Sequence, residues 1–152
     1  MNHESFFIVL SKFMKEYRKI SFKAIEEYEF TPCEIDVLMF LFNNTSLDTA
    51  KDISKFKGIS KSLVSRSVDS LLEKKLISAT PDEQDKRIMH LMLSGNASDI
   101  VEKLKISKEL FSQKVTEGIS ENDLKTFVTV IQQMLENVNH MKEEEMHGVA
   151  IL

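Results

Sequence analysis

The sequence from residue 59 to residue 71 reads Ile59-Ser60-Lys61-Ser62-Leu63-Val64-Ser65-Arg66-Ser67-Val68-Asp69-Ser70-Leu71, and this segment indicates the architecture more strongly than any other. Val64, Val68 and Leu71 recur at steps of four and three residues, which places them on one face of a helix predicted over 60–74. Ser60 is a residue type that caps a helix N-terminus. The opposite face is polar and comprises Ser62, Ser65, Arg66 and Asp69. We therefore expect this helix to pack on a core by its apolar side and to present small polar residues and one arginine outward.

A short helix is predicted directly before this segment. Thr49 and Asp52 have the spacing of an N-terminal capping motif, and Ile53 and Phe56 supply an apolar face. Gly58 allows a tight turn between the two helices because glycine adopts positive φ at little cost. Two helices joined in this way form a helix-turn-helix, whose second helix enters the DNA major groove and reads base edges from its N-terminal part. The alternative is a helical hairpin buried in an all-α core, which the polar outer face disfavours.

The residues that follow change from helical to alternating periodicity. Leu76-Ile77-Ser78-Ala79 predicts a short strand, and the residues from Thr80 to Gln84 are polar and typical of a turn. From Arg87 onward, Met89, Leu91 and Leu93 alternate with Ile88, His90 and Met92, which predicts a second strand. The two strands and their charged turn form a β-hairpin, or wing, directly after the helix-turn-helix.

Amphipathic helices are predicted on both sides of this region. The helix over 4–28 has an apolar stripe wider than one partner helix would cover, which favours packing against a second copy of the chain. The next helix opens with Thr31-Pro32-Cys33-Glu34, a capping box with proline at the first helical position, and is nearly all apolar. The region 96–145 is also helical, with a break at Gly118. The predicted fold class is mostly α with a small β-hairpin wing: a winged helix-turn-helix over 31–94, flanked by dimerisation helices over 4–28 and 96–145, within a single unit over 1–152.

The composition is that of one water-soluble folding unit. The chain has 152 residues, of which 42% are apolar, enough to form a core and too many for a disordered protein. The longest apolar run, residues 37–42, is far shorter than the roughly 18 residues that a membrane span requires. The single cysteine excludes an internal disulfide and fits a reducing compartment. These properties predict a cytoplasmic protein without a membrane partner.

Charge is distributed unevenly along the chain, although the net charge is −4. Residues 51–90 carry 9 basic and 6 acidic groups, whereas the flanking segments are both net acidic. A basic patch of this kind is expected at a phosphate-binding surface, and a solvated lysine-rich helical face is the alternative interpretation. The basic residues of this patch, which acidic groups oppose only sparsely, are Lys51, Lys55, Lys57, Lys61, Arg66, Lys74 and Lys75.

Together these segments resemble the MarR family of winged-helix transcriptional regulators. The resemblance rests on residues 59–71, on Leu76-Ile77, on Asp82-Glu83-Gln84-Asp85-Lys86-Arg87 and on Leu91-Met92-Leu93-Ser94, and the order of the flanking helices extends it to the whole chain. It implies a homodimer, held together by the terminal helices, that binds a pseudo-palindromic operator in double-stranded DNA. It also implies a repressor of transcription. In many relatives a small aromatic ligand releases the repressor from DNA.

The resemblance further implies which residues touch DNA: Ser60, Lys61, Ser62, Ser65, Arg66, Asp85, Lys86 and Arg87. Arg66 would contact the major groove and the backbone, Arg87 would reach the minor groove from the wing tip, and Asp85 would orient the wing by pairing with basic neighbours. The chain departs from the family pattern at five positions: Glu83 replaces a frequent Pro, Lys75 and Ala97 replace frequent Gly residues, and Ala79 and Thr80 replace frequent Arg residues. These departures predict weaker phosphate contact by the wing.

Candidates for a sensing site are fewer. Phe13, Met14, Tyr17 and Tyr28 are candidates to line a ligand cleft, with packing in the core as the alternative. Cys33 is at the second position of a helix, where the helix dipole can make a thiol reactive, so a redox-responsive regulator is an alternative function and an inert buried thiol is the competing interpretation. The four histidines, His3, His90, His140 and His147, lack the spacing of a metal site, and no metal or other cofactor is expected.

Two other functional classes are alternatives to a DNA-binding regulator. An enzyme is not expected, because the sequence contains no glycine-rich phosphate loop, nucleophile elbow or metal-binding motif. A winged-helix protein-interaction module without specific DNA binding remains the alternative, since both flanking segments are acidic and the wing carries Glu83.

Overall fold

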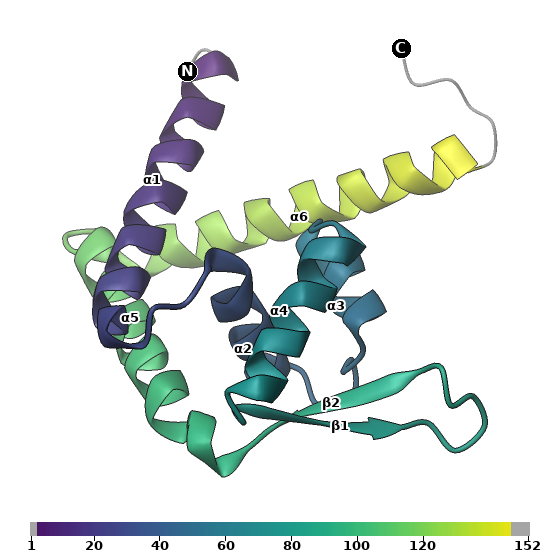
Figure 1. Cartoon of the computed structure of the whole chain (residues 1–152). Coiled ribbons are helices and arrows are strands. Elements are labelled where there is room, and N and C mark those ends of the chain that lie inside the picture. The colour runs from purple at the N-terminus through teal and green to yellow at the C-terminus, as the bar shows by residue number, and fades with distance from the viewer. Residues whose placement is uncertain (1–2, 147–152) are drawn as a thin grey trace. The chain divides into compact units, whose positions relative to one another are not determined.

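The computed structural model describes the backbone of residues 3–146 and the side chains of residues 6–141. It is mostly α with one two-stranded hairpin, as predicted (Figure 1). The elements are α1 (His3–Ala24), the 3-10 helix η1 (Glu26–Tyr28), α2 (Pro32–Asn43), α3 (Ala50–Lys57), α4 (Lys61–Glu73), β1 (Ile77–Pro81), β2 (Met89–Leu93), η2 (Gly95–Ala97), α5 (Ser98–Thr116) and α6 (Glu121–Met146). The chain divides into two compact units, Met1–Phe111 and Ser112–Leu152, and the boundary in the sequence falls within α5. No helix in residues 3–146 is long and apolar enough to cross a membrane.

Helix α2 lies at the centre of the core of the first unit. Its residues Val37 and Leu38 are completely buried, as are Ile53 of α3 and Val64 and Leu71 of α4. Helix α2 contacts α3, α4 and β2. The helix-turn-helix is therefore held on a common apolar support, and the predicted inward face of α4 is confirmed.

The wing is an antiparallel hairpin that extends from the α2–α4 helices (Figure 1). Its register runs from Ile77 opposite Leu93 to Pro81 opposite Met89. The first strand was predicted to end at Ala79, but β1 continues to Pro81, because a proline without an N–H is tolerated at the end of an edge strand. Each strand is thus displaced by one or two residues from its predicted bounds, while the hairpin itself is confirmed.

The first helix is shorter than the predicted span 4–28. It ends at Ala24, after which Ile25 leaves the helical conformation and is buried at 1% exposure. A short 3-10 turn follows, and Glu29 adopts a left-handed conformation at φ 50°. The residue before Pro32 is extended, since proline disfavours the α conformation at the preceding position, so the chain must leave the helical path before it reaches α2.

Phe56 was predicted to share the apolar face of α3 with Ile53, but this is wrong. Its side chain is 62% exposed, whereas Ile53 is fully buried. Helix α3 has only eight residues, and Phe56 lies in its last turn at the edge of the core, with its ring centroid 6.0 Å from that of Phe40. Only the part of α3 around Ile53 lies against the centre of the core, and its last turn lies outside.

The end of α4 forms a Schellman motif around Lys75. The N–H of Leu76 donates to the carbonyl of Leu71 at 3.0 Å, and the N–H of Lys75 donates to the carbonyl of Leu72 at 2.9 Å. This geometry requires a left-handed residue, and Lys75 has φ 58°. Glycine is preferred there because a Cβ in this conformation clashes with the following carbonyl.

Replacing Lys75 with glycine is therefore expected to stabilise the protein by about 0.5–1 kcal/mol, the removed strain exceeding the entropy that glycine adds to the unfolded chain. Urea unfolding of the two proteins measures the change. The matched control is Gly58→Lys at the end of α3, where φ is also positive at 64° and no atom lies within 4 Å of an added Cβ. That substitution should destabilise by a similar amount, and a Lys75→Gly variant that is less stable than the wild type would contradict the argument.

Candidate nucleic-acid interface

Helix α4 presents its predicted polar face to solvent. Ser62, Ser65 and Arg66 are exposed, while Val64 and Ser67 on the other side are buried. The Arg66 Nε donates to the carbonyl of Ser62 at 3.4 Å, which is at the limit of a hydrogen bond and leaves the guanidinium exposed. This face is therefore accessible along its length to a groove of DNA.

The amino end of α4 differs from those of α2 and α3. Thr31 and Thr49 each form a complete capping box, with Glu34 and Asp52 respectively. Ser60 occupies the N-cap position of α4, but its hydroxyl makes no capping bond and lies 3.4 Å from that of Ser62. The predicted cap is thus wrong in its bonding, and within the described part of the chain no side chain accepts from the first amides of this helix.

The turn before α4 is fixed by two local features. Gly58 has φ 64°, and its N–H donates to the carbonyl of Ser54. The Ser54 hydroxyl then donates to the carbonyl of Ile59 at 2.7 Å. The predicted role of Gly58 is confirmed, and these bonds set the angle at which α4 leaves α3.

The wing turn is organised by Asp82 rather than by Asp85. Asp82 Oδ1 accepts from the N–H groups of Gln84 and Asp85, both at 2.8 Å. These bonds and one from His90 lower the pKa of Asp82 to about 2, the Asp85 amide having the largest effect. The predicted pairing of Asp85 with basic side chains is wrong, since its carboxylate accepts from the backbone N–H of Arg87 at 3.0 Å.

The base of the wing is joined to the loop before α3 through His90. Its Nδ1 lies 2.7 Å from Oδ1 of Asp48, and its Nε2 lies 3.1 Å from Oδ2 of Asp82. The two hydrogen bonds, that of Asp48 first, raise the pKa of His90. Sequence reasoning treated His90 as an isolated histidine, because its two partners are 42 and 8 residues away.

The carboxyl end of α4 rests on a buried carboxylate. Glu34 Oε1 accepts from Lys74 Nζ at 2.6 Å and from the Ser70 hydroxyl at 2.7 Å. Its Oε2 accepts from the N–H and the hydroxyl of Thr31 at 2.7 and 2.8 Å. Burial alone would raise the pKa of Glu34, but these bonds, the strongest from Lys74, lower it to about 2. Sequence reasoning found the capping half of this network and missed the half that reaches α4.

The predicted basic patch is smaller than the sequence indicated. Lys74 is engaged by Glu34, and Lys57 lies 3.0 Å from a carboxylate oxygen of Asp36. Within residues 51–90, the exposed basic side chains that form no ion pair with another described residue are Lys51, Lys55, Lys61, Arg66, Lys75, Lys86 and Arg87. The last two are near the tip of the wing, so positive charge remains on both predicted DNA-contacting elements.

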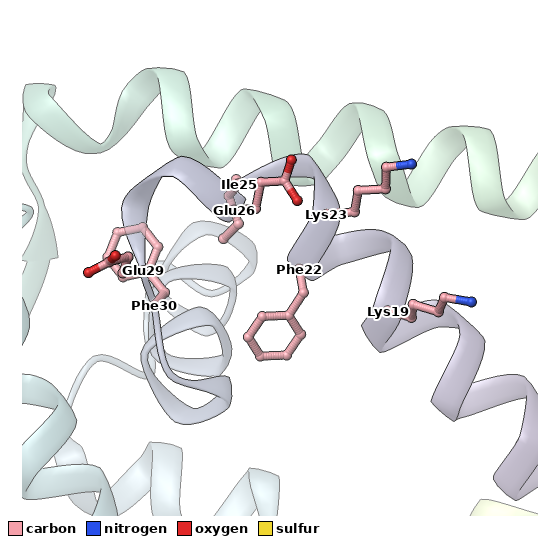
Figure 2. Close-up of a pocket in the computed structure, with 7 residues that line it drawn as sticks. All are labelled: Lys19, Phe22, Lys23, Ile25, Glu26, Glu29 and Phe30. Carbon is pink, nitrogen blue, oxygen red and sulfur yellow. The ribbon is translucent and has the colours of Figure 1, made fainter.

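The first unit also contains an open cavity of about 410 Å³ at the end of α1. Figure 2 shows the rings of Phe22 and Phe30 and the side chains of Lys19 and Lys23, which extend away from the rings. The remaining lining residues are Ile25, Glu26 and Glu29. This arrangement offers apolar contact with charged groups at its rim.

The four predicted ligand-binding candidates do not line this cavity. Phe13 and Tyr17 pack on the ring of Phe111, with centroids 4.8 and 5.4 Å away. Tyr28 stacks on Phe30, with ring centroids 5.8 Å apart, and the Nζ of Lys103 lies 5.1 Å from the centroid of the Tyr28 ring. Met14 is partly exposed on α1.

The remaining sensing candidates are as follows. Cys33 is buried at 4% exposure in the core. Among the side chains described, no group of three His, Cys, Asp or Glu residues could hold a metal ion. His3 and His147 lie outside the described side chains.

Comparison with known proteins identifies this arrangement. The sequence model of the MarR family matches residues 28–88, which include α2, α3, α4 and β1. A MarR transcriptional regulator from Methanosarcina mazei Go1 is 17% identical, with a TM-score of 0.79 over 91% of this chain and 99% of that one. MepR of S. aureus, solved as a complex with DNA, is 22% identical, with a TM-score of 0.72 over 90% of this chain and 98% of that one.

A third similar structure is BpsR of Bordetella bronchiseptica. It is 20% identical, with a TM-score of 0.65 over 83% of this chain and 89% of that one. Its structure is described as showing regulation of DNA binding by 6-hydroxynicotinic acid. At these identities the likeness establishes the fold, which extends beyond the matched segment to nearly the whole chain.

Proposed function

We propose that this chain is a winged-helix regulator of transcription of the MarR family, whose sequence model matches residues 28–88, and that it binds double-stranded DNA through α4 and the wing. The observation that carries the proposal is the exposed polar face of α4, with Arg66 at its centre and no side-chain cap on its first amides. Free helix N-terminal amides favour phosphate, and an exposed arginine in the major groove favours guanine. Lys86 and Arg87, exposed near the wing tip, supply a second contact in the adjacent minor groove.

We further propose that the chain binds DNA as a homodimer. Helix α1 exposes large apolar side chains in its first half: Phe7, Ile8, Val9, Leu10, Phe13 and Met14. Helix α6 independently exposes another set, which includes Phe127, Val128, Ile131, Met134, Leu135 and Val138. Apolar surface of this extent is rare on a monomer, and a two-fold partner that covers it presents two wings to a pseudo-palindromic site.

The proposed mode of regulation is repression that a small ligand relieves. The cavity beside α1 could take an aromatic ring between Phe22 and Phe30. Such a ligand acts only if it binds the DNA-incompetent state better than the competent one. That Phe13, Met14, Tyr17 and Tyr28 line a ligand cleft stays a prediction.

Selection from a random duplex pool, followed by fluorescence anisotropy, tests the proposal. We expect a palindromic site and a binding affinity that falls steeply with salt. Arg66→Ala and Arg87→Ala are each expected to weaken binding by about 1–3 kcal/mol. Arg87→Ala should act mainly at A·T-rich flanks, because a narrow minor groove attracts an inserted arginine.

The matched control is Arg18→Ala, which removes the third arginine of the chain, on α1 and outside both predicted contacts. It changes the net charge equally and should leave affinity nearly unchanged. Equal loss in all three variants would mean that general charge, and not α4 and the wing, governs binding. The protein-interaction alternative would be favoured by two results together: selection enriches no DNA site, and binding to a partner protein survives charge reversal at Arg66 and Arg87.

A further inference from the structure

His90 connects three segments of the chain, one of which lies 42 residues away in the sequence. It is on β2, and its two ring nitrogens face Asp48 in the loop before α3 and Asp82 at the wing turn. A second bond joins the same loop to β2, since the N–H of Leu91 donates to the Asp48 carbonyl at 2.8 Å. The imidazole therefore lies at the junction between the wing and the helix-turn-helix.

The protonation state of the imidazole decides how many of its contacts can exist. An ionised carboxylate only accepts hydrogen bonds, and a neutral imidazole has a single N–H donor. Both contacts therefore require the imidazolium, which donates from Nδ1 and Nε2 together. The charged groups that face His90 in the described structure are Asp48 and Asp82, and the opposing residue on β1 is the neutral Thr80.

Asp82 carries this contact onward to the tip of the wing. Its Oδ2 faces His90, while its Oδ1 accepts from the Gln84 and Asp85 amides that start the turn toward Arg87. Movement of Asp82 therefore moves the turn that holds the wing-tip arginine. The position of that arginine relative to α4 depends on whether Asp82 remains fixed to the loop through His90.

We infer that His90 is a positioning residue whose imidazolium fixes the wing against the loop before α3, and whose loss of a proton frees the wing turn. The consequence for DNA rests on the proposed function: the wing is set for the minor groove when His90 is charged and less ordered when it is neutral. We call this contact of His90 with Asp48 and Asp82 the latch; it is a property of the chain alone and does not require DNA.

The direction of the pH dependence follows from the two carboxylates. They raise the pKa of His90 above its ordinary value of about 6.5. The stabilising contacts are therefore complete below about pH 6.5 and are lost as the pH rises through the higher value in the folded protein. The wing should loosen toward alkaline pH.

Two variants separate a proton-dependent latch from ordinary packing. In Asp82→Asn, Oδ1 still accepts from the Gln84 and Asp85 amides, while the amide nitrogen replaces Oδ2 and donates to Nε2 of a neutral imidazole. This variant keeps both contacts without an added proton. In His90→Gln, the titrating group is absent, and the side chain cannot bridge both carboxylates.

The experiment follows the full-length chain from about pH 6 to about pH 9 at constant ionic strength. Nitrogen NMR of the imidazole reports its protonation, backbone relaxation at residues 83–88 reports wing mobility, and anisotropy reports binding to the selected duplex. In the wild type we expect both ring nitrogens to be protonated near pH 6. Wing mobility should rise and affinity should fall about two- to fivefold as the proton is lost, the size typical of one exposed ion pair.

Asp82→Asn should retain the affinity and rigidity of the acidic wild type at every pH, and His90→Gln should be mobile and weaker at every pH. A neutral His90 in the wild type at about pH 6.5, or an Asp82→Asn variant with the wild-type pH response, would overturn the inference. A wing that loosens with His90 deprotonation in a protein that binds no duplex would support the latch and reject the proposed function.

Discussion

The Glu34→Ala variant is expected to unfold with a free energy about 3 kcal/mol lower than that of the wild type. The substitution removes a carboxylate that is 3% exposed and accepts from Thr31, Ser70 and Lys74. It leaves the Lys74 ammonium and the Ser70 hydroxyl without their acceptor and takes away half of the capping box of α2. Urea unfolding at neutral pH measures the loss.

The matched control for this variant is Glu73→Ala, which removes an exposed glutamate from α4 and should change stability by less than about 0.5 kcal/mol. A Glu34→Ala variant as stable as this control would mean that the four hydrogen bonds only balance the cost of burying the charge.

The same carboxylate gives a defined dependence on pH. The pKa of Glu34 is about 2 in the folded protein and 4.5 in its unperturbed state. Its charged form therefore stabilises the fold above about pH 4.5, and this stabilisation is lost as the pH falls toward 2. The difference between wild type and Glu34→Gln should be largest near neutrality and shrink through this window. A constant difference would show that shape, and not charge, accounts for the effect.

Replacing Leu71 with alanine is expected to destabilise the protein by about 2–5 kcal/mol. Leu71 is completely buried and fixes the last turn of α4 to the core that α2 shares with α3. The loss combines the transfer free energy of the removed atoms with the cost of the remaining cavity. Thermal and urea unfolding report it directly.

Leu63→Ala provides the control on the same helix. Leu63 is 40% exposed, so the identical chemical change should cost less than about 1 kcal/mol. DNA affinity under conditions where both variants are folded should remain near that of the wild type for Leu71→Ala, because the outer face of α4 is unchanged. If the two variants were equally stable, the packing of Leu71 against the core would contribute less to stability than its burial predicts.

Local sequence signals predicted most of the elements. The apolar spacing in α4, the positive φ at Gly58 and the capping boxes at Thr31 and Thr49 all act within one turn of the chain, so their residues carry the information themselves. Gly118, at φ 78°, likewise marks the predicted break after α5. The same logic failed at Phe56, where the periodicity of a short helix did not reveal how far the core extends.

The parts of the candidate interface that sequence did not predict depend on partners far away in the chain. The sequence around Glu34 predicts a capping residue. It does not predict that Oε1 of Glu34 accepts a hydrogen bond from Lys74, which lies 40 residues later in the chain. His90 reads as an isolated histidine because Asp48 is brought to it only by packing of the loop before α3 against β2. Contacts of this kind, between residues distant in the sequence, can be identified only after the tertiary fold is known.

The bare first turn of α4 has a consequence for local dynamics. The capping boxes of α2 and α3 bind the amides of Glu34 and Asp52 through a side chain, whereas the corresponding amide of α4, that of Leu63, donates only to the backbone carbonyl of Ser60 at 3.1 Å. In the free protein this turn should therefore open more often and exchange its amide hydrogens faster than the starts of the other two helices. If α4 binds DNA as proposed, a phosphate at this turn would supply further acceptors for its amides, and the turn should become more protected from exchange on the duplex.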